Sequence, residues 1–199
     1  MHRSFLIFAA AFMALMAGAL FYAARLPVEQ AAPPQPVAQP GEIVEFPSFT
    51  LAGLDGEPRA FSEFDGRHRL LNFWATWCAP CRREIPLLNE FHAEQGEDGI
   101  LVIGIAVDFA DAVTQFAGEF GIAYPVLVGE QDAIEVAEQS GITFNAMPFT
   151  MIVGRDGRLL GAYLGELHRK HLADIATILG RLDRDEISVE SAKGALRRL

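Results

Sequence analysis

Two predominantly apolar runs lie in the middle of the chain, at residues 69–76 (RLLNFWAT) and 100–107 (ILVIGIAV). Runs of this length without polar alternation are typical of strands that are buried on both faces of a sheet. Elsewhere, apolar side chains recur at helical spacing, and the clearest case is the run 111–121. Its apolar face consists of Val113, Phe116, Ala117 and Phe120. The pattern therefore predicts a domain in which buried strands alternate with amphipathic helices.

Turn signals divide the rest of the chain into further elements. Asp-Gly pairs at 55–56 and 156–157 each lie between two short strand-like runs, which predicts two hairpins. In chain order the predicted elements are a hairpin (43–51 and 57–61), a strand (69–76), a helix (80–96), a strand (100–107), a helix (111–121), a strand (124–128), a helix (132–140), a hairpin (149–153 and 158–163), and helices at 168–182 and within 188–199. This order predicts an α/β fold with a mixed central β-sheet, helices on both of its faces and an added N-terminal β-hairpin.

Residues 1–26 predict a membrane anchor. Residues 5–24 are apolar without interruption, and a helix of this length spans about 30 Å, the thickness of the hydrocarbon core of a bilayer. A cleaved signal peptide is the alternative, because Ala17-Gly18-Ala19 fits a cleavage site, although the apolar run is longer than is usual for one. Either interpretation places the rest of the chain outside the cytoplasm. We expect a single N-terminal span with the rest of the chain outside the cytoplasm.

Composition predicts a spacer and excludes one class of partner. Residues 27–40 are rich in proline, which is typical of a semi-extended linker. We place the core domain at 41–182 and a C-terminal tail, expected to be helical, at 183–199. The formal net charge of the chain is −10. A nucleic-acid-binding protein needs a basic face, so we expect no nucleic-acid partner.

The two cysteines of the chain lie together as Cys78-Ala79-Pro80-Cys81, directly after the first buried run. A cysteine at the start of a helix faces unpaired backbone N–H groups and the positive end of the helix dipole. Both stabilise the thiolate, so the thiol pKa falls below its free value of about 8.5, and the thiolate is the form that attacks disulfides. We predict that Cys78 attacks and that Cys81, one turn further along, is shielded and resolves the mixed disulfide. Pro80 stiffens the turn where a missing N–H has no cost.

Other uses of a cysteine pair fit the sequence less well. A zinc site needs two more ligands, and the chain has neither a second cysteine pair nor a finger-like histidine spacing. His168 and His171 could bind a metal one helical turn apart, but two ligands rarely suffice, so we expect no metal and no cofactor. A structural disulfide would close a loop too short to add much stability.

The segment 71–86, LNFWATWCAPCRREIP, resembles the active-site segment of the TlpA/ResA branch of the thioredoxin-like proteins. The run MPFT at 147–150, followed by the Asp-Gly turn at 156–157, resembles the cis-proline loop and the closing hairpin of that family. The resemblance extends over residues 41 to about 182 and implies a thioredoxin-like fold. It also implies a membrane-anchored, periplasm-facing reductase that serves cytochrome c maturation or copper-site assembly in cytochrome oxidase. With this resemblance we expect a bacterial inner-membrane protein with a single N-terminal span and its catalytic domain in the periplasm.

The resemblance implies roles for residues beside the cysteines. Pro148 would be cis and lie against the disulfide, which would leave the backbone of Met147 free to pair with a client strand. Trp77 would cover the sulfur atoms or pack at the end of the strand, and the two are compatible. Trp77, Met147 and Pro80 are therefore the predicted client-binding residues.

Glu84 is the predicted acid of the site. It lies three residues after Cys81 and so shares a helical face with it. In ResA-like proteins an acidic residue at this place tunes cysteine acidity, because a nearby carboxylate raises a thiol pKa. The alternative is a solvated side chain beside Arg82 and Arg83. Asn72 stands where ordinary thioredoxins carry a buried aspartate, which leaves Glu84 as the candidate. The predicted catalytic residues are Cys78, Cys81, Glu84 and Pro148.

The predicted function is reduction of client disulfides, with a membrane electron-donor thiol protein restoring the cysteine pair. The expected partners are disulfide-bearing clients, either apocytochrome c or a copper chaperone, together with that donor and the inner membrane. A disulfide oxidase or isomerase that uses the same cysteines stays open, because the sequence does not fix the redox potential. A copper-binding assembly factor is a further alternative, which the tight cysteine spacing disfavours.

Overall fold

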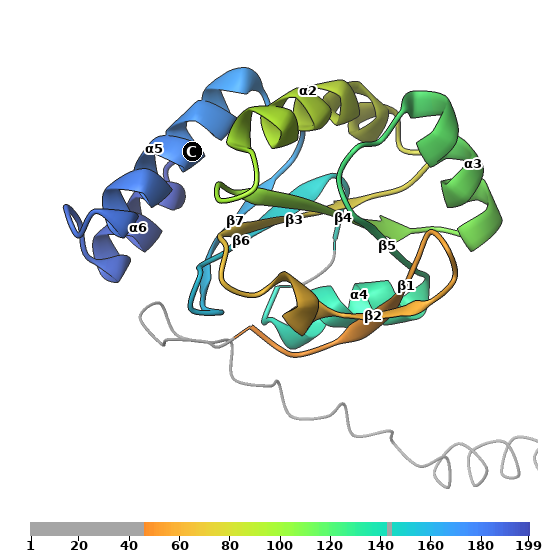
Figure 1. Cartoon of the computed structure of the whole chain (residues 1–199), viewed down its shortest axis with the longest axis horizontal. Helices are drawn as coiled ribbons and strands as arrows, with labels where there is room; N and C mark the ends of the chain where they lie inside the picture. The colour runs from red at the N-terminus through yellow and green to blue at the C-terminus, as the bar shows by residue number, and fades with distance from the viewer. Residues whose placement is uncertain (1–45, 143–144) are drawn as a thin grey trace, which may run out of the picture. The chain divides into compact units, whose positions relative to one another are not determined.

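The computed structural model describes residues 46–142 and 145–199, and within them one seven-stranded sheet forms the centre of the domain (Figure 1). The strands are β1 (Thr50–Gly53), β2 (Pro58–Ala60), β3 (Arg69–Trp74), β4 (Leu101–Val107), β5 (Val126–Gly129), β6 (Phe149–Val153) and β7 (Leu159–Leu164). Their spatial order is β2-β1-β5-β4-β3-β6-β7. The central strands β3, β4 and β5 are parallel, whereas β6, β7, β1 and β2 join antiparallel, so the sheet is mixed.

Helices cover both faces of this sheet (Figure 1). They are the 3-10 helix η1 (Phe61–Phe64) and the α-helices α2 (Ala79–Gln95), α3 (Ala110–Phe120), α4 (Gln131–Gln139), α5 (Arg169–Asp183) and α6 (Val189–Leu196). The buried residues of α2, α3 and α5 share one layer of core, and those of α4 share the opposite layer. This arrangement confirms the predicted α/β architecture with helices on both faces of a mixed sheet.

The side chains of β3 separate the two core layers. Leu70 and Trp74 belong to the layer with α2, α3 and α5, whereas Leu71 and Phe73 belong to the layer with α4. All four are fully buried. Successive side chains of a strand point to opposite faces, so a strand covered on both sides is apolar at most of its positions. β3 therefore runs through the middle of the domain and delivers the residues that follow it to the start of α2.

The C-terminal tail packs beside β7. α6 contacts β7 and α5, and Leu196 of α6 is buried in the layer formed with α2. A Cβ atom placed at Gly161 of β7 would lie 3.2 Å from the Cβ of Leu196, which is closer than side chains normally approach. Ser188 caps the helix, because its Oγ accepts a hydrogen bond of 3.2 Å from the N–H of Ser191. Because Gly161 has no side chain, Leu196 of the tail can pack directly against β7.

The element bounds differ from the predicted ones by a few residues. β5 begins at Val126, two residues later than predicted, because Pro125 has no N–H to contribute to a sheet ladder. At the N-terminal end, β1 begins at Thr50 and pairs antiparallel with β2 across the turn at Asp55. The start of the predicted first strand, residues 43–45, lies outside the described residues.

The predicted cellular location needs correction. Among residues 46–142 and 145–199, no helix is both long enough and apolar enough to cross a membrane. The longest of them, α2, has 17 residues and carries charged side chains, including Arg82, Arg83 and Glu84. The predicted inner-membrane location with a periplasmic catalytic domain is therefore withdrawn. The predicted anchor at 1–26 and linker at 27–40 lie outside the described residues.

Replacing Phe73 with alanine should lower the free energy of unfolding by about 3–5 kcal/mol, because it leaves a cavity in a fully buried layer. The ring of Phe73 stacks on that of Phe149, with centroids 4.3 Å apart. Urea denaturation followed by circular dichroism measures the change. Phe109→Ala is the matched control, because Phe109 is 67% exposed and its truncation should change stability by less than about 0.5 kcal/mol. Equal losses in the two variants would contradict the placement of Phe73 in the core.

Candidate active site

The two cysteines lie where β3 gives way to α2, and they form a disulfide with 5.3 Å between their Cα atoms. Cys78 is the N-cap residue of α2, with extended backbone, and its Sγ accepts a hydrogen bond of 3.3 Å from the N–H of Cys81. Pro80 lies in the first turn, where helical N–H groups have no partner inside the helix. The helix N-terminus is thus directed at the sulfur of Cys78.

The two sulfur-bearing residues differ in their access to solvent. Cys81 is fully buried, whereas Cys78 is 6% exposed and lines a surface hollow of about 470 Å³. Trp77, Pro80 and Met147 line the same hollow. Trp77 is 70% exposed, so it is not packed into the core at the end of β3 but lies on the surface beside the disulfide. Cys81 therefore lies deeper than Cys78, and the attacking and resolving roles of the two cysteines stay a prediction.

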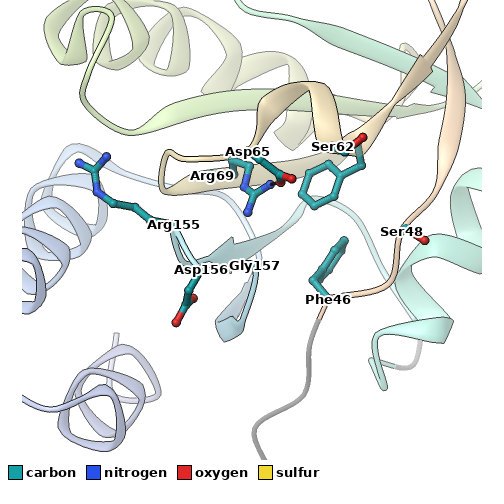
Figure 2. A pocket seen from close by; sticks show the side chains of 9 residues that line it. Phe46, Ser48, Ser62, Asp65, Arg69, Arg155, Asp156 and Gly157 are labelled. Carbon is teal, nitrogen blue, oxygen red and sulfur yellow. Dashed lines mark hydrogen bonds and ion pairs between the residues drawn. The ribbon is translucent and has the colours of Figure 1, made fainter.

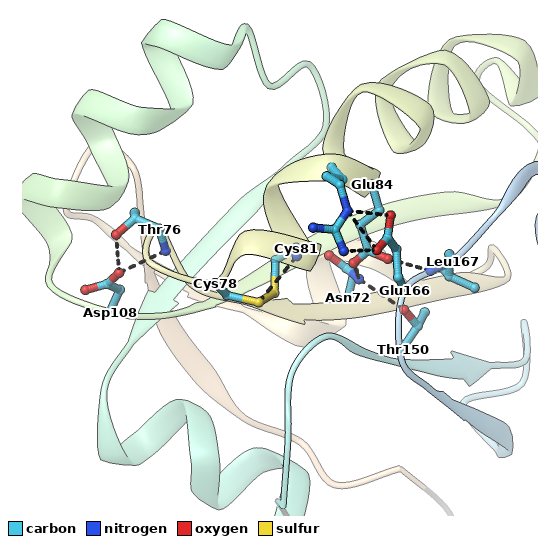
Figure 3. The surroundings of a disulfide bond; sticks show 10 residues. Asn72, Thr76, Cys78, Cys81, Glu84, Asp108, Thr150, Glu166 and Leu167 are labelled. Carbon is cyan, nitrogen blue, oxygen red and sulfur yellow. Dashed lines mark hydrogen bonds and ion pairs between the residues drawn. A yellow bond between two sulfur atoms is a disulfide. The ribbon is translucent and has the colours of Figure 1, made fainter.

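An aspartate fixes the loop that leads into the disulfide. One carboxylate oxygen of Asp108 accepts hydrogen bonds from the backbone N–H of Thr76, at 3.0 Å, and from the hydroxyl of Thr76, at 2.5 Å (Figure 3). Its other oxygen accepts one from the N–H of Phe109, at 2.9 Å. Asp108 therefore ties the end of β4 to the approach to Cys78. No local pattern in the sequence indicates this contact, because it joins residues 32 positions apart.

Glu84 lies inside the domain and is not a solvated side chain. Glu84 is 1% exposed, and each of its carboxylate oxygens accepts a hydrogen bond from a different part of the chain (Figure 3). The side-chain amide of Asn72 in β3 donates to Oε1 at 2.8 Å, and the backbone N–H of Leu167 donates to Oε2 at 2.7 Å. The predicted alternative of a solvated Glu84 beside Arg82 and Arg83 is wrong.

Burial dominates the acidity of Glu84. Removal from water raises the pKa of its carboxyl group from the ordinary value of 4.5 to about 7, against the two hydrogen bonds from Leu167 and Asn72, which lower it. The negative charge of Glu166 adds a smaller upward contribution to this pKa. Glu84 can therefore gain and lose a proton near neutral pH beneath the cysteine pair.

Asn72 and Thr150 complete the polar cluster under α2. The two residues are paired across β3 and β6, and the amide of Asn72 also lies 3.1 Å from the hydroxyl of Thr150. Both are fully buried. The sequence analysis identified Asn72 as the replacement for a buried aspartate, but not as a hydrogen-bond donor to Glu84. The register of an antiparallel pair formed by the 69–76 and 149–153 runs is the signal that would have placed Thr150 beside it.

The peptide bond between Met147 and Pro148 is cis, as the resemblance implied. The carbonyl of Pro148 accepts a hydrogen bond of 2.9 Å from the N–H of Gly165, which holds this loop beside the end of β7. Met147 reaches the hollow next to Cys78, and Pro148 leads directly into β6.

His168 and His171 form hydrogen bonds within the protein at the start of α5. His168 is the N-cap residue of α5, and its backbone N–H donates to Nδ1 of His171 at 3.2 Å. The hydroxyl of Tyr163 lies 3.4 Å from Nε2 of His171. In the described part of the chain, no group of three or more His, Cys, Asp or Glu side chains is placed to hold a metal ion.

Glu84 should make the protein less stable as the pH rises from about 4.5 to about 7. Its pKa is raised by folding, so its contribution to stability is fully present below the unfolded pKa and is lost as the pH rises through the folded pKa. The shift corresponds to on the order of 3 kcal/mol at most. Chemical denaturation at several values between pH 4 and pH 8 measures the change.

The Glu84→Gln variant separates this effect from other titrations. Because glutamine does not titrate, the wild-type free energy of unfolding minus that of Glu84→Gln should fall as the pH rises through this window. A difference that stays constant with pH would contradict a raised pKa at Glu84.

Sequence comparison places the chain among known redox proteins. The family model described as Redoxin matches residues 42–179, more than half of the chain. The thiol-disulfide oxidoreductase ResA of Bacillus thuringiensis (strain Al Hakam) is 30% identical over 129 residues, which cover 64% of this chain and 72% of that protein. ResA of Geobacillus thermodenitrificans (strain NG80-2) is 30% identical over 134 residues, which cover 65% of this chain and 75% of that protein.

Solved structures show the same fold. A thioredoxin-family thiol:disulfide interchange protein from Chlorobium tepidum TLS matches with a TM-score of 0.61 and 27% identity, over 70% of this chain and 95% of its own. A secreted thiol-disulfide isomerase from Corynebacterium glutamicum matches with a TM-score of 0.60 and 28% identity, over 67% of this chain and 84% of its own. These matches confirm the thioredoxin-like fold. Together with the cysteine pair at the start of α2, they show that the chain belongs to the Redoxin family, as a thiol-disulfide oxidoreductase of the ResA type.

Proposed function

We propose that this protein reduces disulfides of client proteins, with Cys78 as the attacking and Cys81 as the resolving cysteine. In the reduced protein, the Cys78 thiolate attacks one sulfur of a client disulfide and bonds to it, and the other client sulfur leaves as a thiolate that takes up a proton. The Cys81 thiolate then attacks the sulfur of Cys78, which forms the Cys78–Cys81 disulfide and releases the second client thiol. Two electrons and two protons pass to the client.

The position of the sulfur atoms supports this division of roles. Cys78 lines the hollow from which a client disulfide could approach, and Cys81 is fully buried behind it. The N–H of Cys81 and the start of α2 are directed at the sulfur of Cys78, where they would stabilise a thiolate. The sulfur of Cys78 is therefore both the one that a client can reach and the one whose thiolate the helix would stabilise.

The buried acid Glu84 is the observation that favours reduction of the client over its oxidation. An ionised carboxylate beneath the pair disfavours thiolates by like-charge repulsion. Strong oxidants of this chemistry owe their potential to a stabilised reduced form, so a group that destabilises the reduced form favours the opposite direction. Glu84 would thus stabilise the Cys78–Cys81 disulfide relative to the dithiol and make the dithiol an electron donor.

The hollow beside Cys78 is the proposed contact surface for the client. Trp77, Pro80 and Met147 line it, and its volume of about 470 Å³ would accommodate side chains next to the client cysteine. Pro148 would hold Met147 in place at the rim. As the family resemblance implies, we propose apocytochrome c or a copper chaperone as the client. A further thiol protein must return two electrons to the pair before the next cycle.

The reduction potential of the Cys78–Cys81 pair should lie at or below roughly −220 mV when the purified protein is equilibrated with glutathione at pH 7. Glu84→Gln should shift this potential upward by about 10–30 mV, because it removes the charge that opposes the thiolates. A wild-type potential near roughly −120 mV would contradict the reductase proposal and favour a disulfide oxidase.

Cys81→Ser should trap the client and stop turnover. With insulin as a model disulfide substrate, this variant should accumulate a mixed disulfide through Cys78, visible by non-reducing electrophoresis and mass spectrometry, because no thiol remains to resolve it. Cys78→Ser should form no mixed disulfide, since the buried Cys81 cannot reach the substrate. Trapping by Cys78→Ser instead would reverse the assigned roles.

A further inference from the structure

An ion pair lies next to the buried acid and joins the two segments that enclose it. The guanidinium group of Arg83 binds the carboxylate of Glu166 through both Nε and Nη2, and the Nη2–Oε2 distance is 2.5 Å. Arg83 immediately precedes Glu84 on α2, and Glu166 immediately precedes Leu167 in the segment between β7 and α5. Figure 3 shows Glu166, one member of this pair, beside the Glu84 cluster. A two-pronged arginine–carboxylate contact fixes orientation as well as distance.

The ion pair lies next to the hydrogen bond that the backbone N–H of Leu167 donates to Glu84. The Leu167 N–H lies 2.7 Å from Oε2 of Glu84, although the two residues are 83 positions apart. The segment between Leu164 and Arg169 is outside any strand or helix, and it is held by the buried side chain of Leu167 and by the hydrogen bond from the N–H of Gly165 to the carbonyl of Pro148. Arg83 and Glu166 connect the residues immediately before each bonding partner. Their ion pair therefore adds a direct tie between α2 and this segment, next to the hydrogen bond itself.

Charged, titratable and neutral polar groups from several elements of the described chain surround Glu84. Glu166 faces it from the segment after β7, and its negative charge disfavours ionisation of Glu84. Tyr124, before β5, is buried and neutral, because burial and then the charge of Glu84 raise the pKa of its phenol. Asn72 and Thr150 supply neutral groups from β3 and β6. Arg83 binds Glu166, so its positive charge offsets that of Glu166 beside the acid.

We propose that Arg83 and Glu166 are positioning residues, whose ion pair fixes the Leu167 N–H against Glu84 and so controls the protonation of the acid beneath the redox pair. The side chain of Arg83 is 61% exposed and that of Glu166 is 21% exposed, so neither is needed to fill the core. The inference rests on the proposed role of Glu84 in setting the redox properties of Cys78 and Cys81.

The test is a titration of the Glu84 carboxyl group by carbon-13 NMR in the oxidised full-length protein. Arg83→Gln should raise the pKa of Glu84 by about 0.5–1 unit, because it removes one tie on the Leu167 segment and leaves the charge of Glu166 without its counter-ion. Glu166→Gln should lower that pKa by a similar amount, because glutamine keeps an acceptor for Arg83 but removes the negative charge. A general loosening of the fold would move both variants in the same direction. Opposite signs show that the two charges act on Glu84, and the hydrogen exchange of Leu167 then tests whether the ion pair also holds this amide in place.

Hydrogen exchange of the Leu167 amide gives a second readout. It should be several-fold faster in Arg83→Gln than in the wild type and close to the wild-type rate in Glu166→Gln. The matched controls are Arg169→Gln and Glu90→Gln, because Arg169 and Glu90 also form an ion pair between α5 and α2 but lie 70% and 58% exposed. Neither control should change the Glu84 titration or the exchange of Leu167.

The outcomes separate this inference from the proposed function. If Arg83→Gln and Glu166→Gln leave the Glu84 titration unchanged or shift it in the same direction, or if the Leu167 amide exchanges at the wild-type rate in Arg83→Gln, the positioning role is overturned whatever Glu84 does. If the two variants shift it in opposite directions but Glu84→Gln leaves the reduction potential unchanged, the ion pair still controls the acid and the proposed role of that acid fails.

Discussion

The burial of one carboxyl group, that of Glu84, is the constraint on which the arrangement around the redox pair depends. A carboxylate removed from water is tolerated only where hydrogen-bond donors replace the solvent. Here the donors come from Asn72 in β3 and from the backbone of Leu167 after β7, on opposite sides of α2 in the sequence. The site is therefore complete only when the sheet, the helix and the connection to α5 have all assembled. Even so, the donors only partly offset the burial, so Glu84 lowers stability near neutral pH.

The fold could be predicted from the sequence because its information is local. The apolar runs of β3 and β4, the periodicity of α3 and the Asp-Gly turns each lie within a dozen residues. The disulfide-forming pair could be predicted for the same reason, since Cys78 and Cys81 occupy one helical turn directly after a buried strand. The cis bond before Pro148 had no local signature and followed from family resemblance alone.

The polar contacts of the site could not be predicted, because they join distant segments. Thr76 meets Asp108 across 32 positions, and Glu84 meets Leu167 across 83. A glutamate that follows two arginines in a helix has the local pattern of a surface residue, and only the packing of distant segments against α2 shows that Glu84 is buried. Trp77 posed the reverse problem: its size suggests packing, yet it is 70% exposed, because the chain turns into α2 at this point.

The seating of the C-terminal tail on β7 has an evolutionary consequence. A side chain at position 161 would approach the Cβ of Leu196 so closely that α6 would have to shift. Every residue except glycine carries a Cβ at 196, so a smaller side chain there would not relieve the contact. Among relatives that keep the tail, position 161 should therefore remain glycine, and a larger residue there should mark the members of the family in which this helix is displaced or absent.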